Sequence, residues 1–344
     1  MKLKASENRQ LTAAIMLNNV SREKGDIHMN ILITGAGLIG TNAARHAVDA
    51  GHKVVLFDLS PNRDYIQTIV GKDKADVVAA DMRDLPALLA ALEKYNVDTL
   101  VATAGLIGSR VQENSYTGAT NNILGTINVL EASRLRKLRR VVYVSTFGAY
   151  DRGKITDSVI RETHPIGGHN LYATTKVCSE HLVHAYASMY NLATIIVRPG
   201  GVFGRGFYVG GSTVGKVMRG LAMSMIKGDP ITVDAKIYGP NEYVYGKDVG
   251  LALFLACQAQ NPKQRIYNAG TGVVHGPEEL AQVVRELTPK TEVKVGGPEI
   301  AEKSRSIPMD ISVSKAELGY APRFSLKEAL RDYMDELWAD GVRG

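Results

Sequence analysis

Apolar and polar positions alternate in a regular way along the chain from residue 30 onward. Short apolar runs bounded by turn residues are typical of strands that are buried on both faces of a sheet. Such runs occupy residues 31–34, 53–58, 76–80, 98–103, 140–145 and 193–198. Helical segments are predicted between them, at about 40–50, 86–95, 121–135 and 170–183. Strands separated by helices predict an α/β fold with a parallel sheet and helices on both faces.

This regular alternation ends after Pro199. The next stretch, residues 200–211, is rich in glycine and aromatic residues, and helical segments and short strands follow it. The helices are predicted at about 213–227, 247–260, 276–287 and 325–338. We expect these elements to form a smaller C-terminal α/β lobe over the carboxyl edge of the sheet, where ligands bind in such folds. Residues 1–29 have no signal-peptide core, and we expect them to be a non-native or disordered leader.

A glycine-rich turn joins the first predicted strand to the first helix. It reads Gly35-Ala-Gly-Leu-Ile-Gly40 and matches the pattern G-x-G-x-x-G, in the strand–turn–helix context that this pattern requires. Gly35 and Gly37 permit a tight turn and a close approach to a pyrophosphate, which would rest on the helix start at Leu38 and Ile39. Gly40 lets the helix pack closely against the strand. The turn therefore predicts a dinucleotide site in a Rossmann-type, doubly wound fold.

Asp58 ends the second predicted strand. A carboxylate at this place accepts hydrogen bonds from both hydroxyls of the adenosine ribose and repels a 2′-phosphate. No arginine immediately follows Asp58, so NAD is favoured over NADP as the cofactor. We therefore predict an NAD-binding Rossmann domain at 30–199, which includes the helix at 170–183. Residues 200–344 are predicted to be mainly a substrate-binding lobe, with some segments returning to the Rossmann domain.

Tyr172 and Lys176 lie in a segment with good helix propensity, at a spacing that places them on one face of a helix. A free tyrosine titrates near about 10 and is a poor base at neutral pH. A nearby ammonium favours the phenolate, so this pair makes a tyrosine that can exchange a proton with an alcohol. The same spacing occurs by chance in many helices, and the other motifs decide between the two interpretations.

Together, these motifs resemble the extended branch of the short-chain dehydrogenase/reductases, the group of sugar-nucleotide epimerases and dehydratases. The likeness covers residues 30 to about 338 and includes several further blocks. Those blocks are Ala80-Asp-Met-Arg-Asp84, Ala102-Thr-Ala-Gly105, Asn122-Ile-Leu-Gly-Thr126, Val142-Tyr-Val-Ser-Thr-Phe-Gly-Ala-Tyr150, Arg198-Pro-Gly-Gly-Val-Phe-Gly204 and Tyr267-Asn-Ala-Gly-Thr-Gly272. The resemblance implies further cofactor contacts at Asp81, Met82, Ala104, Tyr172, Lys176 and Pro199.

The resemblance also implies catalytic roles. In the family, the catalytic hydroxyl lies four residues before a tyrosine at the strand end, and counting back from Tyr150 gives Thr146. Thr146 would donate a hydrogen bond to the substrate oxygen while Tyr172 removes the hydroxyl proton. Lys176 would hold the nicotinamide ribose and lower the pKa of the tyrosine. Ser145 is the second candidate for the catalytic hydroxyl.

Asn122 has two interpretations that do not exclude each other. The resemblance implies that it supports the backbone near the active site and a proton-relay water, while its position also suits a helix N-cap. An arginine near the nicotinamide end, as at Arg110, suits a carboxylate. We expect the substrate-binding residues to be Ser109, Arg110, Thr146, Phe147, Gly201 and Arg205, with Tyr208 and Tyr245 lining the same cavity.

Three departures from the family pattern bear on the cofactor, the reaction and the substrate. The glycine turn is one residue shorter than the usual G-x-x-G-x-x-G. Phe147 and Gly148 stand where the dehydratases have Asp-Glu, so dehydration is disfavoured because no acid there can protonate a leaving hydroxyl. Asn241 stands where sugar-nucleotide enzymes have an arginine that grips the diphosphate, at a fixed spacing before Asp248. Arg205 is the candidate to replace that arginine.

Composition sets further limits. The chain has 344 residues and a formal net charge of +6 that is spread along the sequence, so we expect no nucleic-acid site. No apolar run approaches the ~20 residues that span a bilayer, so no membrane partner is expected. The two cysteines, Cys178 and Cys257, fall in predicted helices, which favours a cytoplasmic protein with reduced thiols. No cysteine or carboxylate pattern completes a metal site around His181 and His184.

The leading hypothesis is an NAD-dependent oxidoreductase that oxidises a secondary alcohol of a small polar substrate, such as a sugar acid or hydroxy acid. The alternative is a sugar or sugar-nucleotide epimerase that retains its NAD. A remote alternative is a non-catalytic regulatory protein that binds NAD. The resemblance implies a homodimer through the helices near 121–135 and 169–190.

Overall fold

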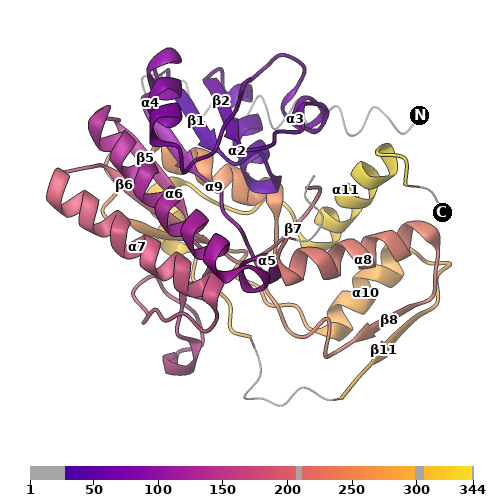
Figure 1. The fold of residues 1–344 in the computed structure, drawn as a ribbon. Coiled ribbons are helices and arrows are strands. Elements are labelled where there is room, and N and C mark those ends of the chain that lie inside the picture. Colours follow the sequence, from indigo (N-terminus) through magenta and orange to yellow (C-terminus); the bar gives the residue numbers. More distant parts are fainter. Residues whose placement is uncertain (1–27, 207–210, 299–305, 343–344) are drawn as a thin grey trace.

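A seven-stranded parallel sheet forms the centre of the protein (Figure 1). The computed structural model describes residues 28–206, 211–298 and 306–342. The strands are β1 (Asn30–Thr34), β2 (Lys53–Asp58), β3 (Asp76–Ala79), β4 (Thr99–Ala102), β5 (Arg140–Val144), β6 (Thr194–Pro199) and β10 (Ile266–Ala269). Their order is β10-β6-β5-β4-β1-β2-β3, so the direction of winding reverses between β1 and β4. This reversal confirms the Rossmann-type doubly wound fold, and ligands bind at such a switch point.

The two faces of the sheet pack against different helices, because side chains alternate along each strand. On β1, Ile31 and Ile33 pack with α2 (Leu38–Asp49), α3 (Arg63–Val70) and α9 (Gly246–Gln258). Leu32 packs on the opposite face, with α4 (Leu85–Lys94), α6 (Ser115–Leu135) and α7 (Leu171–Tyr190). Covering both faces buries β5 and β6 along their whole length, which explains why these strands read as continuous apolar runs.

A C-terminal α/β lobe packs around its own apolar core. Two short strand pairs belong to it: β7 (Gly201–Phe203) with β9 (Tyr243–Tyr245), and β8 (Ile231–Asp234) with β11 (Val293–Gly296). Its helices are α8 (Thr213–Lys227), α10 (Pro277–Leu287) and α11 (Leu326–Ala339). Phe203, Leu221 and Leu330 are buried among these elements. Figure 1 shows the lobe beside one end of the sheet, so the two parts meet near the ends of the central strands.

Two elements of the C-terminal part belong to the large sheet. β10 forms the edge strand beside β6, and α9 covers one face of the sheet next to α2. The sequence pattern grouped the helix at 247–260 with the smaller lobe. Its buried side chains, among them Leu253, Phe254 and Cys257, instead pack in the same core cluster as Ile31. Such a long-range partner is not visible in a local pattern.

Helix α6 begins earlier than predicted. The expected start was residue 121, but the helix starts at Ser115, where the side chain of Asn114 accepts a hydrogen bond from the Thr117 amide at 3.1 Å. Asn114 is therefore the N-cap of this helix. Asn122 lies inside the helix, so its interpretation as an N-cap is wrong.

Met29 lies at the end of the predicted leader but belongs to the folded core. Its side chain is 2% exposed, and its amide donates a hydrogen bond to Nδ1 of His52 at 3.3 Å. The rest of the predicted leader up to residue 27 lies outside the described residues.

Helices α6 and α7 lie side by side on the outside of the sheet (Figure 1). They carry large apolar side chains that are exposed to solvent, among them Tyr116 at 83% and Met189 at 71%. The homodimer through these helices stays a prediction. Among the described residues, no helix is long and apolar enough to cross a membrane.

Candidate active site

The glycine turn has the close packing that its sequence predicted. Gly35 has a φ of +88°, a backbone conformation that residues other than glycine rarely adopt. A Cβ at this position would lie 2.8 Å from the Ala104 amide nitrogen. A Cβ on Gly40 would lie 1.9 Å from the carbonyl oxygen of Gly35. Gly37 precedes α2 without a side-chain cap, so the first amides of the helix have no side-chain acceptor from the cap residue. The turn fits a pyrophosphate, which binds to bare amides at a helix start.

Asp58 is fixed beside this turn at the carboxyl end of β2. One carboxylate oxygen accepts the Ala36 amide and the other accepts the Ser60 amide, both at 2.8 Å. These bonds hold an acceptor at the edge where the second strand meets the glycine turn. The arrangement fits the adenosine ribose of NAD and disfavours the 2′-phosphate of NADP.

Gly40→Ala is expected to lower NAD affinity by about tenfold or more, because the new methyl group must displace the Gly35 carbonyl. Calorimetric titration with NAD measures the effect. Gly220→Ala in α8 is a matched control, since a Cβ there meets nothing within 4 Å. The control should bind NAD normally and gain about 0.5–1 kcal/mol in unfolding free energy. Equal NAD affinity in Gly40→Ala and the wild type would show that the turn does not hold the cofactor.

The remaining predicted cofactor residues lie at the same edge of the sheet. Asp81 follows β3 and forms an ion pair with Arg83 at 2.6 Å, and the hydrogen bond from Arg83 holds the pKa of Asp81 below its usual range. The carbonyl of buried Met82 accepts a hydrogen bond from Asn128 on α6 at 3.2 Å. Ala104 follows β4, and Pro199 ends β6. The carboxyl ends of neighbouring strands thus gather these residues around the switch point.

Thr146, Tyr172 and Lys176 converge where β5 ends. Asn170 caps α7 by accepting the Ala173 amide at 2.9 Å, which fixes the helix start that carries Tyr172. The Thr146 side chain lies close enough to the Tyr172 phenol to lower its pKa. Lys176 is buried and donates to the Val144 carbonyl at 2.7 Å. A proton donor, a proton acceptor and a fixed ammonium therefore meet at one place, as proton exchange with an alcohol requires.

Burial and charge act in opposite directions on the Tyr172 phenol. Burial raises its pKa, while the positive charge of Lys176 and the Thr146 side chain lower it. Burial dominates, so the net pKa of Tyr172 in the chain alone lies above its ordinary value, opposite to the net direction that the sequence predicted. Burial likewise lowers the pKa of Lys176, whereas the charges of Tyr172 and Glu180 raise it.

Asn122 connects the loop after β4 to the helix that carries Tyr172. Its side-chain oxygen accepts the Leu106 amide at 2.8 Å, and its nitrogen donates to the Leu106 carbonyl at 3.0 Å. The same nitrogen donates to the hydroxyl of Thr175 at 3.1 Å. These three bonds hold the loop after β4 next to α7. They agree with the support of the backbone that the resemblance implied for Asn122.

A buried charged cluster behind Thr146 was not predicted from the sequence. Ser145 donates a hydrogen bond to Glu180, which forms an ion pair with Arg198 at 2.5 Å. The Glu180 and Arg198 side chains are 0% and 2% exposed. The Ser145 hydroxyl is therefore engaged with Glu180, and Thr146 is the hydroxyl that faces Tyr172. An arginine at position 198, within an otherwise apolar strand, was the signal that could have revealed this cluster.

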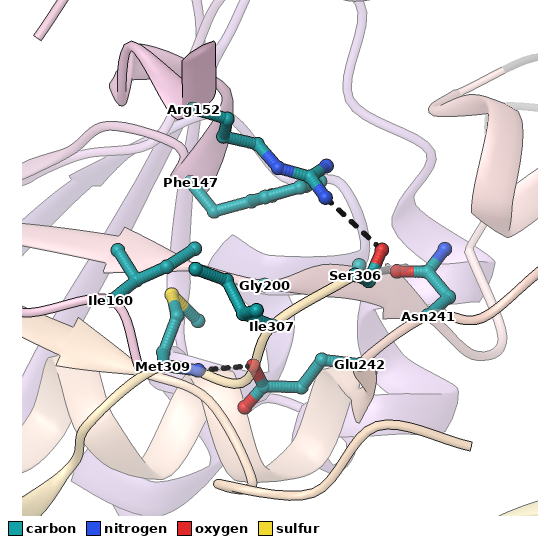
Figure 2. Close-up of a pocket in the computed structure, with 10 residues that line it drawn as sticks. Phe147, Arg152, Ile160, Gly200, Asn241, Glu242, Ser306, Ile307 and Met309 are labelled. Carbon is teal, nitrogen blue, oxygen red and sulfur yellow. Dashed lines mark hydrogen bonds between the residues drawn. The ribbon is translucent and has the colours of Figure 1, made fainter. Parts of the chain in front are cut away.

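A hollow opens between the 3₁₀ turn at Phe147–Ala149, the exit of β6 and residues 306–309 (Figure 2). Phe147 and Gly201, two of the predicted substrate residues, line it, and their role in substrate binding stays a prediction. Asn241 also lines it, next to Gly201, and so do Arg152 and Ser306, which were not predicted. The full lining is Phe147, Arg152, Ile160, Gly200, Gly201, Asn241, Glu242, Ser306, Ile307 and Met309.

Four predicted substrate residues do not line this hollow: Thr146, Ser109, Arg110 and Arg205. Arg205 forms an ion pair with Asp340, a partner that local sequence patterns do not predict. Ser109 begins the short helix α5 (Ser109–Glu113) and accepts a hydrogen bond from Lys216 at 3.4 Å. Arg110, the next residue, is exposed. Arg205 is thus committed to an acid of this chain, so it is not free to replace the arginine missing at Asn241.

Of the two other candidates for the cavity, Tyr245 makes its hydrogen bonds elsewhere. The Tyr245 hydroxyl donates hydrogen bonds to Asp332 at 2.6 Å and to Glu336 at 3.1 Å, within the C-terminal lobe. Tyr208 lies outside the described residues. Asp248 is the aspartate that the family pattern places at a fixed spacing after position 241. Its carboxylate accepts the Arg323 amide at 2.8 Å, and burial raises the pKa of Asp248 to about 6.

A model of the NAD dependent epimerase/dehydratase family matches residues 31–270, which is more than half of the chain. The chain belongs to this family. Like other members of the NAD-dependent epimerase/dehydratase family, it is an NAD-dependent enzyme, in agreement with the glycine turn and with Asp58. The match ends at the turn after β10 and therefore takes in the glycine turn, Thr146, Tyr172 and Lys176.

Two UDP-glucose 4-epimerases are similar to this chain over most of their length, and a steroid dehydrogenase/isomerase is similar over about half of its length. A UDP-glucose 4-epimerase of Mycolicibacterium smegmatis is 28% identical over 88% of this chain and 96% of its own. The crystal structure of Thermus thermophilus UDP-glucose 4-epimerase in complex with NAD has a TM-score of 0.75 and 27% identity, covering 90% of this chain and 99% of that one. A 3 beta-hydroxysteroid dehydrogenase/Delta 5-->4-isomerase of Mycobacterium tuberculosis is 29% identical over 51% of this chain and 48% of its own.

Proposed function

We propose that this chain is an epimerase that oxidises a secondary alcohol of a sugar or sugar nucleotide and then reduces the same carbon from the opposite face. The observation that carries the proposal is the convergence of Thr146, Tyr172 and Lys176 at the edge that holds the glycine turn. The names of relatives that match nearly their whole length support an epimerase over the net oxidation that the sequence favoured.

Tyr172, Thr146 and Lys176 each have a separate role in the proposed reaction. Tyr172 takes the proton from the substrate hydroxyl, and Thr146 donates a hydrogen bond to the same oxygen as charge develops on it. Lys176 stabilises the phenolate through its charge. NAD, when bound, supplies the acceptor and then the donor of the hydride. In the return step Tyr172 gives the proton back to the carbonyl oxygen, so the substrate and the enzyme end in their starting protonation states.

Dehydration is not proposed, although the family includes dehydratases. Phe147 and Gly148 follow Thr146, and neither side chain can protonate a leaving hydroxyl. Glu242 is the acid that lines the hollow, and its carboxylate accepts the amides of Met309 and Gly272, both at 2.8 Å. It is thus held by the backbone and does not point to the reacting hydroxyl.

A dehydrogenase of a small polar substrate is the second candidate, and one observation favours it. Asn241 lines the hollow at the position where sugar-nucleotide enzymes of the family have an arginine. Losing a bidentate cation weakens the grip on a diphosphate. A substrate without a nucleotide would not need that contact. A non-catalytic NAD-binding regulator stays the remote alternative, because it would have no use for the three converging groups.

The fate of the reducing equivalents separates the candidates. With UDP-glucose and catalytic amounts of NAD, an epimerase is expected to form the isomeric sugar without accumulating NADH. A dehydrogenase instead releases NADH in equal amount to its ketone product, and a regulator forms neither. Nuclear magnetic resonance of the sugar and absorbance of NADH, recorded on one sample, give both quantities. NADH released in step with product would contradict the epimerase and support the dehydrogenase.

A further inference from the structure

A buried acid lies one helical turn away from the lysine of the active site. Glu180 follows Lys176 by four residues on α7, so the two side chains share one face of the helix. Both are buried, since Lys176 is 4% exposed and Glu180 is 0% exposed. Little water screens charges at such positions, so each group acts strongly on the other. Glu180 is therefore placed to influence the group that influences Tyr172.

Two side chains from neighbouring strands hold the Glu180 carboxylate in place. Arg198 on β6 contacts both carboxylate oxygens, through Nε at 2.9 Å and Nη2 at 2.5 Å. The hydroxyl of Ser145, which directly follows β5, donates a further hydrogen bond to the same carboxylate. A two-point contact with a guanidinium fixes the orientation of a carboxylate as well as its position. Glu180 thus carries a negative charge that is fixed relative to α7 and the sheet.

The other contacts of the Lys176 ammonium are with neutral groups. It donates to the Val144 carbonyl at 2.7 Å and lies 4.9 Å from the centre of the Tyr143 ring. Neither group carries a full charge that could offset the removal of the ammonium from water. Burial lowers the pKa of Lys176, while the negative charge of Glu180 raises it. Glu180 therefore opposes the loss of the proton that burial favours.

We propose that Glu180 is a positioning residue of the active site, whose fixed carboxylate keeps the Lys176 side chain in its ammonium form beside Tyr172. Glu180 acts through Lys176 and does not touch the substrate. Arg198 and Ser145 serve the reaction by holding Glu180. The inference rests on the proposed function, because a charged lysine is needed here to stabilise the phenolate that takes a proton from an alcohol.

Other titratable side chains that interact with this pair are neutral where Lys176 loses its proton. Burial raises the pKa of Tyr143, and it raises the pKa of Tyr150 to about 12. Burial lowers the pKa of His184 on α7, so its imidazole is neutral in the alkaline range. Changes in these groups therefore do not obscure the effect of Glu180 on the lysine.

The titration of Lys176 tests the proposal directly. Nuclear magnetic resonance of the full-length protein, isotope-labelled at the lysine ε-carbon, records this titration, and the Lys176→Met variant identifies the signal. Glu180→Gln removes the negative charge at nearly constant size, which favours the neutral amine. It is expected to lower the pKa of Lys176 by about one unit or more. During turnover, the alkaline limb of the kcat profile should move to lower pH by a similar amount, because the phenolate loses its ammonium there.

Glu131→Gln is the matched control, because it makes the same change in a glutamate–arginine pair at the surface of α6. The Glu131 and Arg134 side chains are 26% and 34% exposed. The control should leave the titration of Lys176 as in the wild type. Glu180→Leu combined with Arg198→Met is the second test variant, and it applies even if Glu180→Gln does not fold, since apolar replacement of a buried pair is often neutral. It should also lower the pKa of Lys176, but by less, because a positive charge is removed with the negative one.

The outcomes separate a role in the reaction from a purely structural one. A fall in the pKa of Lys176 that is confined to the Glu180 variants supports the proposal. A Lys176 that titrates as in the wild type in a folded Glu180 variant, or an equal fall in Glu131→Gln, would overturn it. The titration needs neither substrate nor turnover, so its result holds even if the protein epimerises no sugar and the proposed function fails.

Discussion

A Tyr172→Phe variant is expected to convert its substrate about 10²- to 10⁴-fold more slowly than the wild type, with unchanged affinity for NAD. The phenol is the group placed to take the hydroxyl proton, since the charge of Lys176 and the Thr146 side chain both act to lower its pKa. Removing one oxygen leaves the aromatic ring and its packing in place. The loss should therefore fall on kcat and not on folding.

The measurement is the rate of product formation under saturating substrate, together with calorimetric titration of NAD. Tyr190→Phe is the matched control, because it makes the same change on the same helix at a residue that is 47% exposed. Its ring still packs against the Arg134 guanidinium. The control should turn over like the wild type. Unchanged turnover in Tyr172→Phe would remove this residue from the mechanism.

Arg198→Met is expected to lower the unfolding free energy by about 3–5 kcal/mol, because it leaves the buried Glu180 carboxylate without its partner. Arg198 makes two contacts with this carboxylate, through Nε at 2.9 Å and Nη2 at 2.5 Å. Its guanidinium also stacks on the ring of Tyr150, with its carbon 4.5 Å from the ring centre. The loss combines an uncompensated charge with lost packing.

Denaturant unfolding of the single and double variants separates these contributions. Glu180→Leu combined with Arg198→Met removes both charges and should recover much of the lost stability, since apolar replacement of a buried pair is often neutral. Arg45→Met is the matched control, because the Arg45–Asp49 pair is about half exposed and such pairs contribute about 0–1 kcal/mol. A loss in Arg198→Met no larger than in Arg45→Met would show that the cluster does not stabilise the fold.

The same variant should show a characteristic pH dependence. An unpaired buried carboxylate has a raised pKa, so it binds a proton more readily in the folded state than in the unfolded state. A raised carboxyl pKa gives a stability contribution that is present at low pH and is lost as the pH rises. The difference between Arg198→Met and the wild type is therefore expected to be smaller in acid than at neutral pH.

Local spacing was sufficient to predict the parts of the site that lie on one element or one turn. Gly35, Gly37 and Gly40 define the glycine turn within six residues, and Tyr172 and Lys176 share two turns of one helix. The alternation of apolar runs and helices also predicted the doubly wound sheet, because each strand must be buried on both faces. The glycine turn and the Tyr172–Lys176 pair depend on contacts close in sequence, whereas the sheet follows from the burial pattern of its strands.

Contacts between segments that are far apart in the sequence could not be predicted from local spacing. The acid that engages Arg205 is Asp340, and the hydroxyl that meets Arg152 is Ser306, each far away in the chain. A charge in a loop looks the same in the sequence whether it faces a substrate or another residue of the fold. Lys176 does lower the pKa of Tyr172, as predicted, but burial raises it further, and burial depends on everything packed around the phenol.

The central claim is that a tyrosine next to a fixed ammonium meets the substrate alcohol beside an NAD seated on the glycine turn. A crystal structure of the protein with NAD tests this most directly. We expect the pyrophosphate to lie over Gly35–Gly40, the adenosine ribose at Asp58 and the nicotinamide beside Tyr172 and Lys176. A nicotinamide ring that lies away from the Tyr172 phenol, or a dinucleotide bound elsewhere, would contradict it.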